Sequence, residues 1–305
     1  YCNDYSNNYN IDSTCEYYEA VDLRNRDIPQ TTRMQSARNV ANNVVQNNDK
    51  LLFGLAGFNP PTSSWYQSDG APGGEIVASC GTSENNLTNR IDNFRADSNT
   101  PLAETFYEIT RYFRGMSTYY NGNNSYTSPI KYRCQKNFVI VITDGLATYD
   151  NSFPDNDRDA GRRLPDWDGL SPYTRQNDYP NFPRDSDGFN PSGSESDEGY
   201  TLFLDDLAQF GYETDMMPYG DDVSGAPFDS PGFGKRNLTT YTVGFSIENQ
   251  NLKDTARKGG GKYYTAGNEQ ELIASLNSAI ADINARTSSA SSVATNSTKL
   301  ATDTM

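Results

Sequence analysis

The chain has 305 residues, a formal net charge of −15, 35% hydrophobic residues and a mean hydropathy of −0.78. The acidic balance argues against nucleic acid and anionic membranes as partners, because both require lysine and arginine to neutralise phosphates. The chain contains no histidine, which excludes Ser-His-Asp and Cys-His catalysis and histidine-ligated zinc. A metal site would therefore be built from oxygen ligands, which favours Mg, Mn or Ca. No apolar stretch is long enough to predict a membrane span.

Four cysteines are present, and none of them forms a C-x-x-C pair. An even number of cysteines without that spacing fits two disulfides and an oxidising compartment. Three pairings are possible, and four free thiols are the alternative. We favour a local loop between Cys2 and Cys15 and a longer clip between Cys80 and Cys134.

The first half of the chain predicts a helix, a strand and a second helix. Residues 1–30 are polar and show no clear core strand. Thr31 and Thr32 can cap a helix whose apolar residues share one face through Val45. Residues 51–58 read as a strand, and 60–98 are expected to be mostly irregular, with one further strand at 75–78. A helix then begins at Pro101, with Thr100 as its cap, and continues to Phe113.

The second half alternates strands and helices with long polar insertions. Strands are predicted at 137–143, 238–245 and 262–265. Helices are predicted around 200–210, 252–258 and 272–283, and three glycines from Gly259 to Gly261 end the second of these. Residues 146–199 and 215–236 show no apolar period, so the former is either a functional insertion or disordered. The Ser/Ala/Thr-rich residues 287–305 read as a linker to a following domain.

This alternation predicts an α/β fold with a parallel-type sheet covered by helices on both faces. The order opens on a helix rather than a strand, so the first strand is expected to be missing. The predicted organisation is a polar cysteine-containing loop at 1–30, one α/β domain at 31–286 and the linker at 287–305. The domain carries insertions at about 60–98, 146–199 and 215–236.

One strand ends at a candidate functional residue. Residues 138–142 are a continuous apolar run that leads into Thr143, Asp144 and Gly145. Such a run is typical of a strand buried on both faces. Ligands of open α/β sheets bind at the carboxyl ends of the strands. Asp144 is therefore placed for metal binding or catalysis, and the alternative is that it only caps a turn.

Two segments carry a family resemblance, F-V-I-V-I-T-D-G at 138–145 and N-T-P-L-A-E at 99–104. They resemble the von Willebrand factor A domain. A closer likeness is carried by the segments 100–115, 134–145, 234–246, 253–266 and 288–298. They resemble the PilC/PilY family of type IV pilus-tip adhesins. Together these cover most of residues 31–300. The resemblance implies a Rossmann-like A-domain fold.

In the wider family, an adhesion site holds Mg or Mn through a D-x-S-x-S motif, a threonine and an aspartate. The resemblance assigns the threonine to Thr100 and the aspartate to Asp144. D-x-S-x-S does not follow any apolar strand here, and the segment from Asp4 to Asn8 matches it only in part. The missing motif lies upstream of these residues or has been lost in this member, and we favour the first explanation. The adhesion site predicted within this chain is therefore partial.

A second candidate site lies in the acidic insertion. Asp155, Asp157 and Asp159 alternate at the spacing of a calcium loop, but no glutamate closes the loop as in an EF-hand. The D-W-D-G at 166–169 and the D-S-D-G at 185–188 repeat this acidic theme. The alternative to calcium binding is a solvated acidic loop.

These observations predict a binding module rather than an enzyme. The resemblance implies an extracellular adhesin at the pilus tip or the outer cell surface. Its implied partners are a host or surface ligand, the minor pilins of the tip complex, and a propeller-type domain C-terminal to this one. One alternative is a structural or force-bearing A-type domain with an incomplete metal site. Another is a metal-dependent hydrolase, which the missing histidines and the lack of a nucleophile–base pair disfavour.

Overall fold

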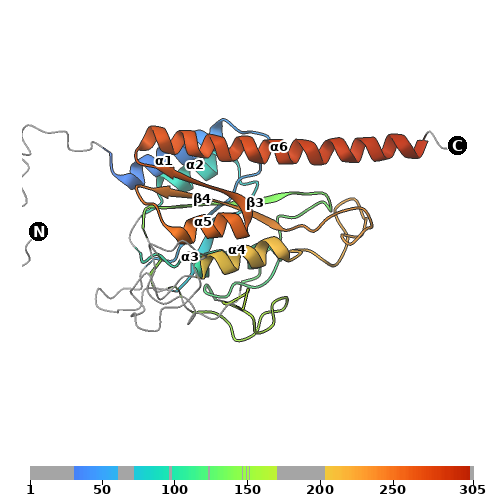
Figure 1. Ribbon diagram of the computed structural model, residues 1–305, viewed down its shortest axis with the longest axis horizontal. Coiled ribbons are helices and arrows are strands. Elements are labelled where there is room, and N and C mark those ends of the chain that lie inside the picture. The colour runs from blue at the N-terminus through green and yellow to red at the C-terminus, as the bar shows by residue number, and fades with distance from the viewer. Residues whose placement is uncertain are drawn as a thin grey trace, which may run out of the picture. The chain divides into compact units, whose positions relative to one another are not determined.

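The computed structural model describes residues 31–60, 72–95, 98–122, 124–145, 147, 148, 150, 152–169 and 203–302. All helices and strands described below lie in one compact unit, Arg33–Met305 (Figure 1). In chain order they are α1 (Arg33–Gln46), β1 (Leu55–Phe58), β2 (Gly74–Ala78), α2 (Glu84–Asp92), α3 (Leu102–Phe113), β3 (Asn137–Thr143), α4 (Leu204–Glu213), β4 (Leu238–Phe245), α5 (Gln250–Lys258), β5 (Gly260–Ala266) and α6 (Glu269–Thr302).

The centre of the unit is a three-stranded parallel sheet in the order β3-β4-β5. Asn137 of β3 lies opposite Leu238 of β4, and the pairing continues in register to Thr143 and Gly244. Every residue of β4 is buried, as expected for the middle strand of a sheet covered on both faces. The predicted parallel α/β architecture is confirmed at this level.

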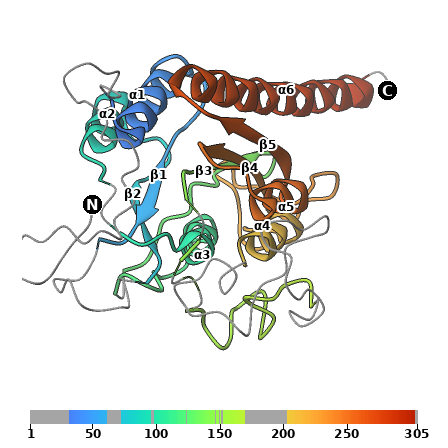
Figure 2. The ribbon, with the colours of Figure 1, turned by 60° about the vertical axis from the view of Figure 1, so that its left-hand side comes forward.

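Helices cover both faces of this sheet. Figure 2 shows α3, α4 and α5 on one side and α1 and α6 on the other. The side chains of β4 alternate between two apolar clusters, as the period of a strand requires. Leu238 packs with Phe106 and Leu207 on the α3/α4 side. Tyr241 and Val243 pack on the α1/α6 side.

A separate two-stranded antiparallel sheet pairs β1 with β2. The strand predicted at 51–58 is shorter than expected and begins at Leu55. The further strand predicted at 75–78 is confirmed as β2. The interpretation of the rest of 60–98 as irregular is wrong where α2 lies. Helix α2 buries only Leu87 and Ile91, so its apolar period was too sparse to predict it.

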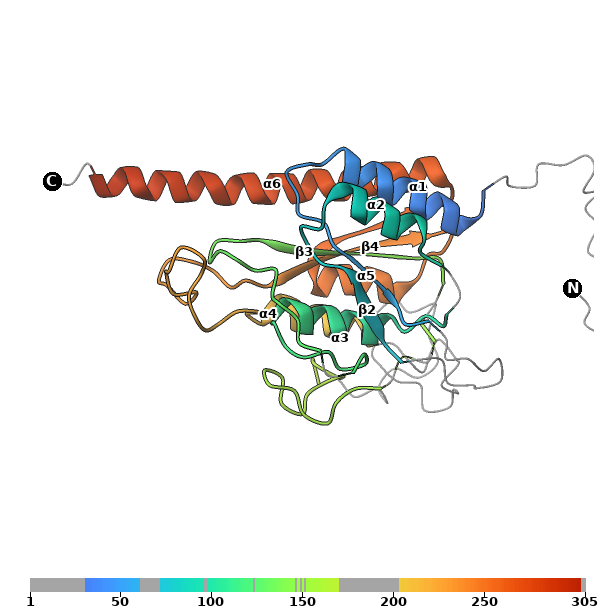
Figure 3. The same ribbon diagram turned by 180° about the vertical axis from the view of Figure 1, so that it is seen from behind.

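The polar insertions contribute to the core. Ala147, Ala160 and Trp167 in the 146–199 segment are buried in the main cluster, as are Met216 and Phe228 in 215–236. Of the linker predicted from 287, the residues up to Thr302 are helical, because α6 continues to that residue (Figures 1 and 3). Among the described residues, no helix combines the length and apolarity needed to cross a membrane.

Candidate functional site

Asp144 lies directly after β3, at the carboxyl edge of the parallel sheet. Its side chain is 54% exposed, and its Oδ2 lies 3.5 Å from Nη1 of Arg33, the first residue of α1. Exposed pairs of this kind add at most about 1 kcal/mol to stability. Asp144 is therefore an accessible carboxylate at the edge where sheets of this class bind ligands.

Thr100 lies in the loop before α3, and that loop is bonded to the loop that follows β3. The Thr100 N–H donates to Oγ1 of Thr148 over 3.1 Å, and the Thr148 N–H donates to the Thr100 carbonyl over 3.2 Å. The structure thus brings together the two loops that carry Thr100 and Asp144. The prediction that Thr100 caps α3 is wrong, because the N-cap is Pro101 and no side chain of that residue bonds the helix.

The cap of α3 comes from Asp150. Its two carboxylate oxygens accept the N–H groups of Ala103 and Glu104, each over 2.7 Å. Burial, and then the charge of Glu104, raise the pKa of Asp150 well above its ordinary value. Glu104 is itself fully buried and accepts the N–H groups of Gly73 and Ser152. No sequence motif links Asp150 to a helix more than 35 residues upstream, which is why sequence analysis missed it.

The calcium loop predicted at Asp155, Asp157 and Asp159 already has a cation from the protein itself. Nη1 of Arg114 lies 2.7 Å from Oδ1 of Asp157 and 2.9 Å from Oδ2 of Asp159. Burial would raise the pKa of Asp157, but bonds to Arg114 and its charge outweigh burial and hold that pKa below its ordinary value. The guanidinium therefore neutralises Asp157 and Asp159, whereas Asp155 is exposed. Calcium binding at these three aspartates stays a prediction.

A different acidic cluster gathers Asp166, Asp168 and Asp206. One carboxylate oxygen from each lies within 4.8 Å of the others, so the group could hold a metal ion. Oδ1 of Asp206 accepts the N–H groups of Trp167 and Asp168 over 3.0 and 3.1 Å. Burial raises the pKa of Asp206 to about 7, with Lys258 opposing the rise. This is the sole cluster of three such ligands within the described part of the chain.

Lys258 supplies a positive charge to this acidic cluster. Its Nζ lies 2.8 Å from Oδ2 of Asp168 and 2.9 Å from Oδ2 of Asp205. Burial would lower the pKa of Lys258, but the surrounding carboxylates raise it above its ordinary value. The D-W-D-G motif at 166–169 could be recognised in the sequence as an acidic site. The contribution of Asp206 could not be predicted, because this residue comes from the first turn of α4.

The disulfide predicted between Cys80 and Cys134 is absent, since both residues are free cysteines. Burial raises the pKa of the Cys80 thiol, whereas Cys134 is exposed. Cys2 and Cys15 lie outside the described residues, so that predicted pair stays a prediction.

Comparison of this chain with known proteins identified no relative. No protein-family model, no curated protein and no solved structure matches this chain.

Proposed function

We propose that this chain is the A-type α/β domain of a type IV pilus-associated tip adhesin and acts as a binding module rather than an enzyme. It would be exposed at the pilus tip or the outer cell surface and contact a surface or host ligand and minor pilins. The observation that carries this proposal is the carboxyl edge of the sheet. There the exposed Asp144 follows β3, and the loops of Thr100 and Thr148 are bonded to each other.

The donor set at this edge supports only part of a metal site. Asp144 and Thr100 offer a carboxylate and a hydroxyl, which suit Mg or Mn. The structure places the Arg33 guanidinium beside Asp144, and the acidic ligand group found among the described residues lies elsewhere. The residues described here therefore do not fit a complete adhesion site, and ligand binding is proposed through the Asp144 edge itself.

The Arg33–Asp144 pair also favours a second candidate, a structural A-type domain that positions the tip complex. An arginine beside the aspartate supplies the charge that a divalent ion would otherwise supply. In that case binding to minor pilins would be independent of Mg and Mn.

Binding to immobilised minor pilins tests the proposal, with wild type and Asp144→Ala measured in Mg and in EDTA. Asp221→Ala, outside the carboxyl edge, is the matched control. We expect binding that Asp144→Ala weakens at least about tenfold and that Asp221→Ala leaves unchanged. Equal binding by all three proteins would place the contact elsewhere, and no binding would refute the adhesin proposal.

Unfolding midpoints test whether a divalent ion takes part in binding at this edge. A ligand at a hundred times its dissociation constant adds about 2.7 kcal/mol, which shifts the midpoint by about 5 °C in a domain of this size. A shift with Mg or Mn that Thr100→Ala abolishes would mean that a metal-dependent adhesion site forms at this edge. No shift is expected if the Asp144 edge binds without a metal ion, and the pilin-binding measurement then separates the two candidates.

A further inference from the structure

Asn121 and Gly122 lie in a loop between the paired residues Ser117 and Ser125 (the 117–125 loop). They form the sole Asn-Gly pair of the sequence. The backbone nitrogen of the residue after an asparagine can attack the side-chain amide carbon and release ammonia, and glycine allows this attack best because it has no Cβ to obstruct it. In a folded chain the reaction also requires that the attacking N–H group is not held in a hydrogen bond.

The N–H group of Gly122 meets this requirement. No described residue accepts a hydrogen bond from it. Gly122 is exposed, its φ is +78°, and a Cβ at this position would meet no atom within 4 Å. The backbone around Gly122 therefore has room to rotate into the geometry of attack.

Two described Asp-Gly pairs could react in the same way, with water as the leaving group, but both are blocked. In one, the N–H of Gly145 donates to Oγ1 of Thr143 over 3.2 Å. In the other, the N–H of Gly169 donates to Oδ1 of Asp166 over 2.8 Å. Either bond must break before the nitrogen can attack, whereas Gly122 needs no such step.

The side chain of Asn121 ties the 117–125 loop to β2. Its Nδ2 donates to the carbonyl of Gly74, the first residue of β2, over 2.7 Å. The preceding Tyr120 adds a second contact, since its hydroxyl donates to the carbonyl of Ser152 over 2.6 Å. A carboxylate at position 121 could only accept hydrogen bonds, so it would repel the Gly74 carbonyl. The contact with β2 therefore depends on the amide of Asn121.

We propose that Asn121 is a self-modification site, and that its conversion to isoaspartate or aspartate releases the 117–125 loop from β2. The nitrogen of Gly122 bonds to Cγ of Asn121, and the Cγ–Nδ2 bond breaks. The proton of the Gly122 N–H passes through water to the departing nitrogen, which leaves as ammonia. Water then opens the five-membered ring at either carbonyl and yields isoaspartate or aspartate. The inference is independent of the adhesin proposal.

Storage of the folded chain in mildly alkaline buffer, followed by peptide mass spectrometry, measures the conversion at each asparagine. Asp144→Asn supplies the matched control, because it creates a second exposed Asn-Gly pair whose glycine N–H is held by Thr143. We expect position 121 of this variant to be converted about tenfold faster than position 144, since one hydrogen bond must break before Gly145 can react. Adding Thr143→Val should remove the difference.

Unfolding midpoints of these variants establish that each is measured in its folded state. Equal conversion at the two positions of Asp144→Asn would overturn the proposal, because the hydrogen bond of Gly145 would then not decide reactivity. An Asn121 that stays intact in the folded chain, while the urea-unfolded chain is converted, would overturn it as well.

Asn121→Asp imitates one product and tests the release of the loop. Amide hydrogen exchange should speed up about tenfold at Thr118, whose N–H donates to the carbonyl of Asn124 over 2.7 Å. Asn124→Asp is the matched control, because it adds the same charge to the loop and leaves the bond from Asn121 to Gly74 in place. Equal exchange at Thr118 in the two variants would overturn the release of the loop.

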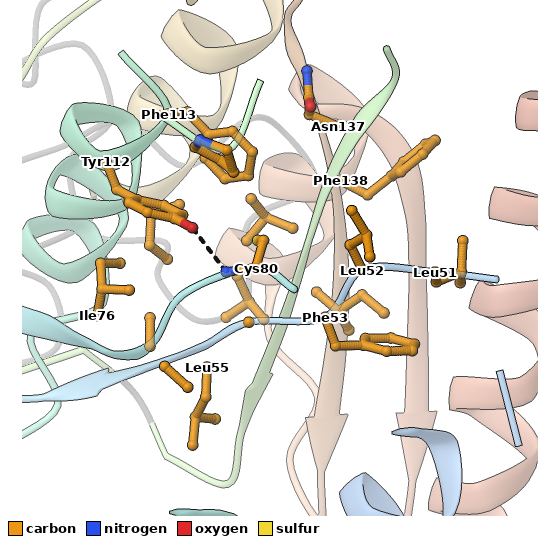
Figure 4. Close-up of a pocket in the computed structure, with 18 of the residues that line it drawn as sticks. Leu51, Leu52, Phe53, Leu55, Ile76, Cys80, Tyr112, Phe113, Asn137 and Phe138 are labelled. Carbon is orange, nitrogen blue, oxygen red and sulfur yellow. Dashed lines mark hydrogen bonds between the residues drawn. The ribbon is translucent and has the colours of Figure 1, made fainter. Parts of the chain in front are cut away.

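Cys80 shows whether the release stays local. Gly74 begins β2, whereas Cys80 follows its end and lines an apolar cavity of about 570 Å³ between β1 and β3. Its N–H donates to the hydroxyl of Tyr112 over 2.8 Å (Figure 4). We expect the rate of maleimide labelling at Cys80 to be the same in wild type and Asn121→Asp. Faster labelling in the variant would mean that the whole domain opens, and it would overturn the proposal.

Discussion

Arg114 binds Asp157 with both ends of its guanidinium. Nη1 lies 2.7 Å from Oδ1 and Nη2 lies 3.0 Å from Oδ2, and both side chains are fully buried. The hydroxyl of Tyr107 also donates to Oδ2 of Asp157 over 2.7 Å. This network fastens the acidic insertion to α3, and its energetics can be tested directly.

Asp157→Asn should lower the free energy of unfolding by about 2–3 kcal/mol, because it removes the bidentate carboxylate from the buried Arg114 and leaves that charge paired with Asp159 alone among the described residues. Urea denaturation measures the loss. The double variant Arg114→Met/Asp157→Leu should cost less than the sum of the two single changes, since it removes both charges of the buried pair together and leaves Asp159 paired with Arg158. Additive costs would mean that the two side chains do not interact.

Acid should weaken the same pair. The folded-state pKa of Asp157 lies below its ordinary value, so its contribution is present above about pH 4 and is lost as the pH falls toward the folded-state pKa. The urea midpoint of the wild type should therefore drop between about pH 4 and pH 2 more steeply than that of Asp157→Asn. Parallel pH profiles for the two proteins would contradict this assignment.

Asp150→Ala should destabilise the domain by about 1–3 kcal/mol, because two buried N–H groups of α3 lose their acceptors. Thr100→Ala, which removes the cap expected from the sequence, should change stability by less than about 0.5 kcal/mol in EDTA. Chemical denaturation measures the free energy of unfolding of both variants. A larger loss of stability for Thr100→Ala than for Asp150→Ala would mean that Thr100 caps α3 after all.

The sequence was sufficient for the elements with strong local patterns. Val139 and Val141 belong to a continuous apolar run, and that run is β3, paired in parallel with β4 as expected. Helix α2 escaped prediction because only Leu87 and Ile91 mark its buried face. The Leu, Ile and Val pattern therefore predicts interior strands better than surface helices.

The candidate sites were harder to predict, because their partners are distant in sequence. The spacing of Asp155, Asp157 and Asp159 resembles a cation loop, and the cation is Arg114, 43 residues before Asp157. Asp144 could be placed correctly from the sequence, because it directly follows Thr143, the last residue of the predicted strand. The acid at Asp206 required knowledge of how α4 packs.

Gly261→Ala should destabilise the domain by about 3 kcal/mol. A Cβ at this position would overlap the carbonyl oxygen of Thr240, where β5 runs beside β4. Gly145→Ala is the matched control, since a Cβ there meets no atom within 4 Å. It should change stability by less than about 0.5 kcal/mol. Thermal and urea unfolding of both variants measure the difference, and equal losses would contradict the close approach of the two strands.

Removing Lys258 should make the acidic cluster depend on calcium. In the wild type, Nζ of Lys258 lies 2.8 Å from Asp168 and 2.9 Å from Asp205, so the cluster already has a cation, and calcium should shift the unfolding midpoint little. Lys258→Met should lose about 3–5 kcal/mol in EDTA, because it removes the positive charge that lies against the buried carboxylates of Asp168 and Asp205.

Calcium should then restore part of the stability lost by Lys258→Met, because Asp166, Asp168 and Asp206 offer it the oxygen ligands that it prefers. Lys258 lowers the pKa of Asp206, which is about 7 in the wild type, so its removal raises that pKa further. The measurement therefore belongs well above pH 8, where calcium finds this carboxylate ionised. Adding Asp206→Asn to Lys258→Met should abolish the calcium effect. A midpoint that rises by several degrees with calcium in the wild type, and not in Lys258→Met, would mean that the metal binds alongside the lysine rather than in its place.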